Sequence, residues 1–295
     1  MADSLVKQSA RPAAPRGSEI GSARAGARYR RDGFVVLPQV FSASQIRKLR
    51  AETASICRGE RGAVRGAARH LQRETDDDVI RRFLCIHHPH KLSRLMRKAV
   101  MHPDIAGLLG AAIGPNVKCM QSMLFVKGPG KPGQPWHQDE FFIPTRDRSL
   151  CGVWIALDDA TVANGCLWVI PKSHASGVIY PTRPLADARF DGSPVAYGFA
   201  GGEKSARPVP VAAGGVVIFN GYLLHQSLPN TTTDNFRRAL VFHVMRAESL
   251  LPWDDEGRMP HSEDMRDIFM VRGKDPYAWK GTTEVLEPYL RETSY

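Results

Sequence analysis

Short apolar segments, each bounded by Gly, Pro, Asn or Asp, follow one another through the middle of the chain. They are rich in β-branched and aromatic residues, which favour strands. The pattern predicts strands at residues 117–126, 150–157, 166–170, 215–219 and 238–244. Many short strands separated by turn signals are typical of a sandwich or barrel, and not of a parallel sheet with crossover helices.

The first third of the chain has a different pattern. Residues 32–37 form an apolar stretch that predicts one further strand. Apolar residues at helical spacing after Ser42 predict an N-capped amphipathic helix, and a second helix is expected to begin at Pro103. Residues 58–90 are highly charged and predict loops with short helices.

Two later segments carry no clear periodicity. Residues 176–213 are polar and rich in Gly and Pro, and a loop of this length inside a compact domain usually covers a functional site. Residues 248–295 mix proline, tryptophan and acidic clusters, so we expect an irregular segment with short helices. The whole pattern predicts a mainly β fold with flanking helices.

Composition narrows the class of protein. The chain has 295 residues, of which 43% are apolar and 24% are charged, so it can bury a large core. No stretch approaches the roughly 20 apolar residues that a membrane-spanning helix needs. The five cysteines include no C-x-x-C pair, which argues against a disulfide framework or zinc knuckle and favours a reducing compartment. We therefore expect a cytoplasmic protein.

Half of the net charge of +10 lies at the N-terminus. Residues 1–31 contain seven basic and two acidic residues but no apolar periodicity, which predicts a disordered basic tail. Organelle import is a second interpretation, although Pro12 and Pro15 interrupt an amphipathic helix. Nucleic-acid binding is disfavoured because Tyr29 is the one aromatic residue in the tail. The remaining positive charge is spread through the body of the chain and favours an anionic substrate.

The sequence Pro-Trp-His-Gln-Asp-Glu at residues 135–140 carries the main chemical signal. On a strand, residues i and i+2 point to the same face, so His137 and Asp139 would present an imidazole and a carboxylate side by side. His225, just past an apolar strand, adds a second imidazole. Two histidines and one carboxylate form a facial triad that leaves positions of Fe(II) open for oxygen chemistry.

The spacing His-x-Asp is not specific alone, because His102 and Asp104 also have it at a predicted helix start. The context downstream of His225 separates the two matches. Ser227 is two residues further on the same face, and Arg237 follows His225 by 12 residues at the next strand. A guanidinium in that place suits a clamp for a dicarboxylate, because it can bind a carboxylate through two hydrogen bonds.

Several short motifs follow one another along the chain, from residue 32 to residue 239. They are Asp-Gly-Phe-Val-Val-Leu (32–37), Trp-His-Gln-Asp (136–139), Gly-Val-Trp-Ile-Ala-Leu (152–157), Asn-Gly-Cys-Leu-Trp-Val-Ile-Pro (164–171), His-Gln-Ser (225–227) and Phe-Arg-Arg-Ala (236–239). With them the chain resembles the phytanoyl-CoA dioxygenase family of Fe(II)/2-oxoglutarate oxygenases. The resemblance implies a single oxygenase domain at 32–295, with a double-stranded β-helix (jelly-roll) core at about 117–245. Residues 42–115 would be its helical support.

The same resemblance implies a set of site residues. The iron ligands would be His137, Asp139 and His225. The residues around the far carboxylate of the co-substrate 2-oxoglutarate would be Arg237, Ser227, Trp154 and Met123. Alignment on Phe-Arg-x-Ala selects Arg237 over Arg238 as the inward arginine. Gln121 and His243 are further candidates for the pocket.

The implied activity is a dioxygenase reaction that hydroxylates an unactivated C–H bond of a small or medium organic substrate with O2. Succinate and CO2 would be released. In halogenating relatives a small residue replaces the carboxylate, so the presence of Asp139 favours hydroxylation. We expect the substrate contacts to come from residues 58–90, 176–213 and the C-terminal fifty residues. The sequence indicates neither the substrate nor the oligomeric state.

Two other functions fit the same residues. A cupin-like isomerase or hydrolase could use the His/Asp/His ligands with another metal and without 2-oxoglutarate. A jelly-roll protein that only binds a ligand is the other alternative. Arg237 argues against the cupin-like enzyme, because without 2-oxoglutarate there is no evident need for a buried carboxylate clamp.

Overall fold

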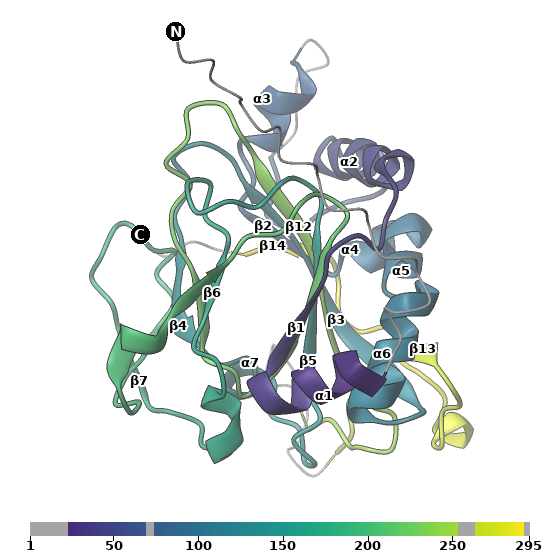
Figure 1. Cartoon of the computed structure of the whole chain (residues 1–295). Helices are drawn as coiled ribbons and strands as arrows, with labels where there is room; N and C mark the ends of the chain where they lie inside the picture. Colours follow the sequence, from purple (N-terminus) through teal and green to yellow (C-terminus); the bar gives the residue numbers. More distant parts are fainter. Residues whose placement is uncertain (1–22, 69–73, 253–262, 292–295) are drawn as a thin grey trace, which may run out of the picture.

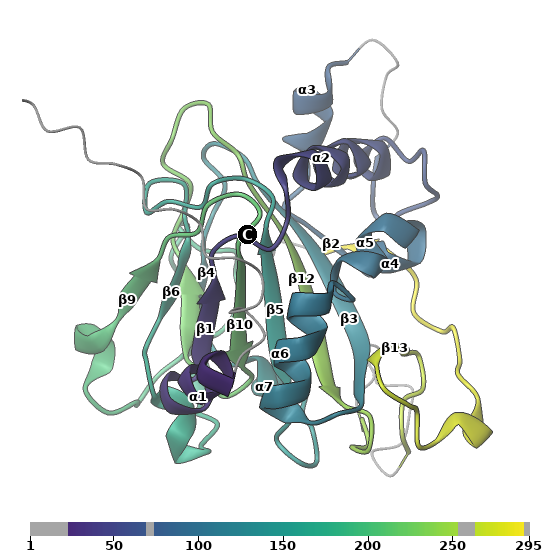
Figure 2. The same cartoon turned by 45° about the vertical axis from the view of Figure 1, so that its right-hand side comes forward.

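The computed structural model describes residues 23–68, 74–252 and 263–291. Two antiparallel sheets face each other, and α2, α5 and α6 cover the outer side of the larger sheet (Figures 1 and 2). This arrangement confirms the predicted mainly β fold with flanking helices.

The larger sheet has eight strands and the smaller sheet has four. The larger sheet runs β1 (Phe34–Leu37), β10 (Val216–Asn220), β5 (Cys151–Ala156), β12 (Arg237–Arg246), β3 (Val117–Lys127), β2 (Cys85–His87) and β14 (Tyr289–Leu290), and β13 (Phe269–Arg272) also pairs with β3. The smaller sheet runs β4 (Gln134–His137), β11 (His225–Ser227), β6 (Leu167–Val169) and β9 (Arg207–Val209). A separate pair is formed by β7 (Thr182–Arg183) and β8 (Val195–Ala196).

The described helices lie mostly in the first half of the chain. The α-helices are α1 (Ala23–Asp32), α2 (Ala43–Cys57), α3 (Asp76–Ile80), α4 (Pro89–Leu92), α5 (Arg94–Ala99), α6 (Pro103–Ile113) and α7 (Asp139–Phe142). Short 3₁₀ turns are η2 (Ser173–Ser176), η3 (Gly202–Ser205) and η4 (Ala278–Lys280). Among the helices of the described residues, none combines the length and apolar character needed to cross a membrane.

All six predicted strands and both predicted helices are present, with ends shifted by one or two residues. Ser42 caps α2 as expected: its hydroxyl accepts a hydrogen bond from the Gln45 amide, and the Gln45 side chain accepts one from the Ser42 amide. The structure corrects three segments. Residues 176–213, which we expected to be one long loop, contain β7, β8 and β9. Residues 58–90 contain β2, and residues 248–295 contain β13 and β14, where we expected loops and short helices. These strands are only two to four residues long, too short to show a period.

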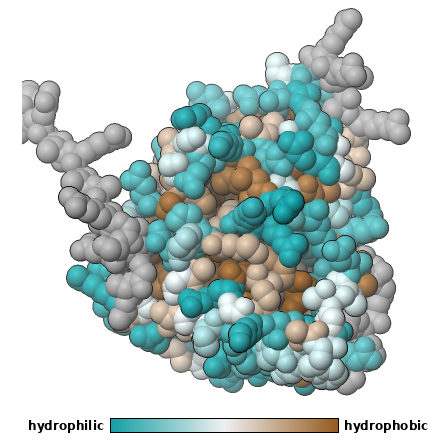
Figure 3. All heavy atoms as spheres, turned by 90° about the vertical axis from the view of Figure 1, so that its right-hand side faces the viewer, coloured by the Kyte–Doolittle hydropathy of each residue, from teal (hydrophilic) through white to brown (hydrophobic). Residues whose placement is uncertain are grey.

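The central strands of the larger sheet are apolar on both faces because both faces are covered. On β5, Val153 and Ile155 pack in the core shared with α2 and α6, whereas Trp154 and Ala156 pack in the space between the two sheets. A strand that is buried on both faces reads as a continuous apolar run instead of an alternating one. Seen from the helical side, the surface shows hydrophobic patches among hydrophilic residues (Figure 3).

We predicted that residues 23–31 belong to a disordered tail. This is wrong, because they form most of α1. Ala25 and Tyr29, one turn apart, are buried in the main core, and α1 lies against β1 and α6. Arg30 donates a hydrogen bond to the Ala111 carbonyl at 3.2 Å. Two buried side chains are too few to show a helical period in the sequence. The rest of the predicted tail, residues 1–22, lies outside the described residues.

If α1 is part of the folded core, Tyr29→Ala should destabilise the protein by about 3 kcal/mol, as is usual when a large buried side chain is truncated. Tyr29→Phe removes the hydroxyl, which accepts a 3.4 Å hydrogen bond from Asn220 and also hydrogen-bonds with Cys151, and should cost about 1 kcal/mol. Chemical denaturation of the two variants measures both values. Equal stability of Tyr29→Ala and the wild-type protein would show that the segment does not pack as described.

Candidate active site

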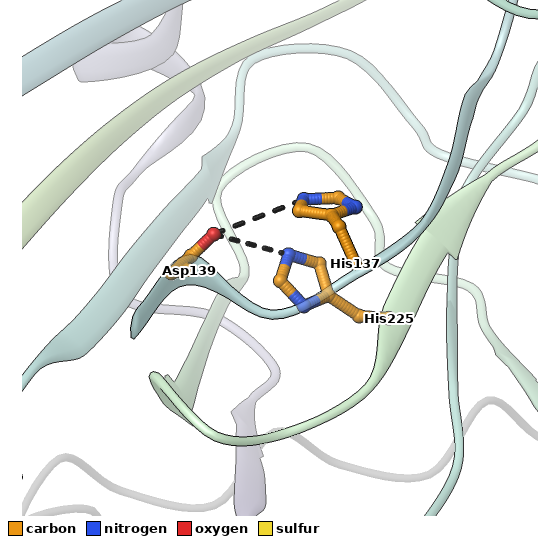
Figure 4. A group of neighbouring side chains, drawn as sticks. All are labelled: His137, Asp139 and His225. Carbon is orange, nitrogen blue, oxygen red and sulfur yellow. Dashed lines mark ion pairs between the residues drawn. The ribbon is translucent and has the colours of Figure 1, made fainter. Parts of the chain in front are cut away.

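Two histidines meet where β4 and β11 pair. His137 and His225 are direct partners across the strands, and their ring centroids are 4.1 Å apart. The carboxylate of Asp139 lies beside both rings, with Oδ1 3.8 Å from Nε2 of His137 and 3.5 Å from Nε2 of His225 (Figure 4). Ligand–metal distances are about 2 Å, so two ligands of one ion are at most about 4 Å apart. The three side chains can therefore bind a single ion.

The structure corrects how Asp139 reaches this position. We expected Asp139 on the same strand as His137, but β4 ends at His137 and Asp139 is the first residue of α7. Gln138 between them is still extended, with φ −127° and ψ 132°. Its side chain faces away from the histidines and donates to the Val178 and Tyr222 carbonyls. The predicted proximity of His137 and Asp139 is correct, although the helix turn and not a strand produces it.

Hydrogen bonds to the backbone set the tautomer of both histidines. Nδ1 of His137 lies 2.7 Å from the Pro135 carbonyl oxygen, and Nδ1 of His225 lies 2.9 Å from that of Leu223. A carbonyl can only accept, so each Nδ1 carries a proton and each Nε2 keeps its lone pair for a metal. Burial, together with His225, lowers the pKa of His137 to about 3 and keeps this imidazole neutral.

The second oxygen of the Asp139 carboxylate is held by His243. Nε2 of His243 lies 3.1 Å from Oδ2, so Oδ1 is left facing the two metal-site histidines. Burial raises the pKa of Asp139, but the neighbouring histidines and the His243 hydrogen bond lower it further, and the net direction is down. His243 pairs in register with Gln121, which lies 3.5 Å from the His87 ring.

All nine sequence-predicted site residues line one cavity of about 1000 Å³. They are His137, Asp139, His225, Arg237, Ser227, Trp154, Met123, Gln121 and His243. Within the described part of the chain, the two histidines and Asp139 are also the one cluster with metal-binding geometry. The carboxylate and two imidazoles match the donor set of non-haem Fe(II) sites.

Arg237 is the inward arginine, as the alignment predicted. It is 3% exposed, lies over the Trp154 ring at 5.7 Å, and its Nε has no hydrogen-bond partner among the described residues. Burial lowers its pKa to about 10, so it remains charged near neutral pH. Arg238 instead forms an ion pair of 2.7 Å with Asp158. A buried guanidinium without a carboxylate partner fits the far end of a dicarboxylate ligand.

Two of the three segments that we expected to contact the substrate line the cavity. The region 58–90 and the C-terminal segment both contribute to the cavity, but no residue of the loop 176–213 lines it. That loop packs on the outer side of the smaller sheet, where Tyr180 and Phe199 contact Trp136 and its neighbours. This segment therefore mainly covers the smaller sheet, and it reaches the cavity only indirectly, through the ion pair of Asp191 with the lining residue Arg291.

Several residues near the cavity were missed by the sequence analysis. Lining residues among them are Phe142, Lys131, His87, Arg82, Arg65, Tyr289 and Arg291. Most come from segments without a readable period, and nothing in their local sequence marks them. Phe142 could have been predicted, since it lies only three residues after Asp139. In the structure its ring centroid is 6.1 Å from that of His137.

Two facing antiparallel sheets with a His/Asp/His cluster between them define a jelly-roll protein with a facial-triad metal site. The comparison with known families gives the particular group. The model of the family "Phytanoyl-CoA dioxygenase (PhyH)" matches residues 29–239. The chain therefore belongs to the phytanoyl-CoA dioxygenase family.

Similar proteins agree with this assignment. Phytanoyl-CoA dioxygenase domain-containing protein 1 of Danio rerio is 33% identical over 188 residues, which cover 61% of this chain and 62% of the relative. The chain thus matches less than two thirds of that relative's length. The solved structure of the epimerase SnoN has a TM-score of 0.64 at 21% identity and covers 86% of this chain and 99% of its own. EvdO2 of Micromonospora carbonacea var. aurantiaca has a TM-score of 0.57 at 26% identity and covers 80% and 94%. These neighbours confirm the jelly-roll core.

Replacing the shared carboxylate tests the metal site. Asp139→Ala should weaken Fe(II) binding more than about 100-fold, because it removes a ligand and leaves His243 without its partner. Anaerobic equilibrium dialysis measures the affinity. Asp104→Ala is the matched control, since it alters the other His-x-Asp pair on the first turn of α6 and should leave Fe(II) binding unchanged. Equal Fe(II) affinity of the two variants would contradict the site.

Proposed function

We propose that this protein is an Fe(II)- and 2-oxoglutarate-dependent dioxygenase that hydroxylates an unactivated C–H bond of a small or medium organic substrate. One observation carries the proposal: the metal-binding cluster and the unpaired, buried Arg237 open into the same cavity. A metal-dependent isomerase or hydrolase needs the first feature but not the second.

Different residues of the cavity would bind the metal and the co-substrate. His137, Asp139 and His225 would hold the iron, and Arg237 with the Ser227 hydroxyl would bind the far carboxylate of 2-oxoglutarate. When bound, iron and 2-oxoglutarate supply the oxidising power, by oxidative decarboxylation of 2-oxoglutarate with O2 to succinate and CO2. Trp154 and Met123 give this end of the cavity apolar walls that exclude water and strengthen the ion pair.

Similar structures support the cofactors but leave the reaction outcome open. SnoN was solved in complex with Fe3+ and alpha ketoglutarate, and EvdO2 in complex with 2-oxoglutarate. SnoN is an epimerase, so this fold is compatible with outcomes other than hydroxylation. Our choice of hydroxylation rests on Asp139, whose carboxylate occupies the third ligand position. The cytoplasmic location expected from the cysteines stays a prediction.

Anaerobic titration with Fe(II) and then 2-oxoglutarate, followed by visible absorption, tests the proposal without a known substrate. We expect a weak charge-transfer band that requires both additions. Arg237→Ala should raise the 2-oxoglutarate concentration for half-saturation at least tenfold, because it removes the charge-assisted hydrogen bonds. Arg238→Ala is the control and should leave this concentration unchanged, because Arg238 pairs with Asp158 and not with the ligand.

The other outcomes of this titration separate the alternatives. Stoichiometric iron binding without the band would favour the cupin-like metalloenzyme. Absence of metal binding would favour a jelly-roll binding protein.

We further propose that the substrate is anionic. Among the described residues that line the cavity, five are Lys or Arg and Asp139 is the one acidic residue. Part of this charge is neutralised, since Arg82 pairs with Glu74 and Arg291 with Asp191. Lys131 is half-buried, and its ammonium has no hydrogen-bond or ion-pair partner among the described residues. Burial lowers the pKa of Lys131, so binding an anion would stabilise its charged form.

Succinate release, measured across pairs of candidate substrates that differ only as acid and primary amide, tests the charge. We expect the acids to be preferred, and Lys131→Gln to raise the KM for an accepted acid about tenfold with little change in kcat. Lys98→Gln, which removes an exposed charge on α5, is the control and should leave KM unchanged. A preference for the amides would overturn the anionic substrate while leaving the oxygenase intact.

A further inference from the structure

A second buried cation stands behind the carboxylate end of the cavity. Lys127 is the last residue of β3 and is 2% exposed. Its ammonium donates hydrogen bonds to Oγ of Ser227 at 2.9 Å and to the Leu228 carbonyl at 2.7 Å. Ser227 and Arg237 line the cavity and Lys127 does not, so Lys127 can act on a ligand only through its neighbours.

The hydrogen bonds around Ser227 leave its hydroxyl with one remaining role. Oγ accepts from Lys127 and from the backbone amide of Gln134, at 2.9 and 3.3 Å. A serine hydroxyl has two lone pairs and one proton, so both acceptor positions are used. Since Ser227 lines the cavity, its O–H is available to donate to a ligand there. Lys127 donates to Oγ and so favours this direction of the hydroxyl.

Lys127 also adds charge at this position. It is the direct cross-strand partner of Arg237, so the two cations share one face of the larger sheet. Neither has a carboxylate ion-pair partner among the described residues. Burial and the neighbouring Arg237 lower the pKa of Lys127 well below its usual value, and an anion bound beside the two groups would raise it again. A carboxylate placed here would relieve that repulsion.

Packing holds the lysine in place. Gly165 has φ +81°, and a Cβ at this position would lie 3.2 Å from both Cδ and Nζ of Lys127 and 2.2 Å from the Leu228 carbonyl oxygen. The side chain of Lys127 thus lies tightly between the loop before β6 and the end of β11. Its ammonium is held where it meets Ser227.

We propose that Lys127 is a positioning residue for the co-substrate: it directs the Ser227 hydroxyl into the cavity and, with Arg237, forms a dicationic end that selects 2-oxo acids with a second carboxylate. The inference rests on the proposed function, because it assumes that 2-oxoglutarate binds in this cavity. It predicts that Lys127 affects the far carboxylate of the ligand and not its metal-chelating end.

Calorimetric titration of the Mn(II)-loaded protein under anaerobic conditions tests this with two ligands. 2-Oxoglutarate and 2-oxobutyrate share the chelating end, but only 2-oxoglutarate has a second carboxylate. Lys127→Met should raise the Kd of 2-oxoglutarate at least tenfold and leave those of 2-oxobutyrate and Mn(II) within about twofold. In a Ser227→Ala background the same substitution should have a much smaller effect, because Lys127 acts through that hydroxyl.

Lys118→Met is the matched control. Lys118 is also fully buried on β3, but it donates to the Ser249 carbonyl at 2.5 Å, away from the cavity. Its loss should lower the melting temperature without changing the Kd of either oxo acid. Equal weakening of both oxo acids by Lys127→Met would reduce Lys127 to a structural role and overturn the proposal.

Two further outcomes distinguish failure of the Lys127 proposal from failure of the proposed function. Ser227→Ala, which removes one hydroxyl, must itself weaken 2-oxoglutarate; if it does not, the proposal fails even where Lys127→Met does not fold. A wild-type protein that binds Mn(II) but neither oxo acid would instead overturn the proposed function.

Discussion

The pairing of His137 with His225 is the constraint on which the rest of the site depends. It joins the end of β4 to the start of β11 and brings two Nε2 atoms toward one carboxylate oxygen. Each ring is held by a hydrogen bond from Nδ1 to a backbone carbonyl, so the Nε2 lone pairs face the cavity. The metal-binding geometry is thus a property of the strand pairing, and Asp139 completes it from the next helix turn.

Burying these polar groups requires a large apolar framework. The strands of the larger sheet supply it, because their outer faces pack on α2 and α6 while parts of their inner faces remain free for polar residues. Arg237 and Lys127 sit at the ends of adjacent strands, where two buried cations face the smaller sheet. Buried charge without an ion-pair partner destabilises a fold, and neither cation has such a partner among the described residues. The proposed function assigns this role to the far carboxylate of 2-oxoglutarate.

Different parts of the site were predictable to different degrees. The proposed iron ligands, Arg237 and Ser227 could be named because motifs with characteristic spacing carry them. Lys127 could not, since a lysine at the end of a β-strand usually reaches solvent, and only the cross-sheet contact with Ser227 shows otherwise. The position of Asp139 was predicted for the wrong reason, because strand alternation and a strand-to-helix turn can both place it beside His137.

The sequence by itself determined the mainly β class, the order of the strands along the chain, the family and the residues of the candidate metal site. These follow from local patterns: apolar runs between turn residues, and motifs whose members lie close together in the chain. Tertiary structure alone decided that α1 joins the core, that residues 176–213 cover a sheet and not the site, and that β2 and β14 border the cavity. Each of these depends on contacts between residues far apart in the chain, whose free energy comes from shared burial that no local pattern records.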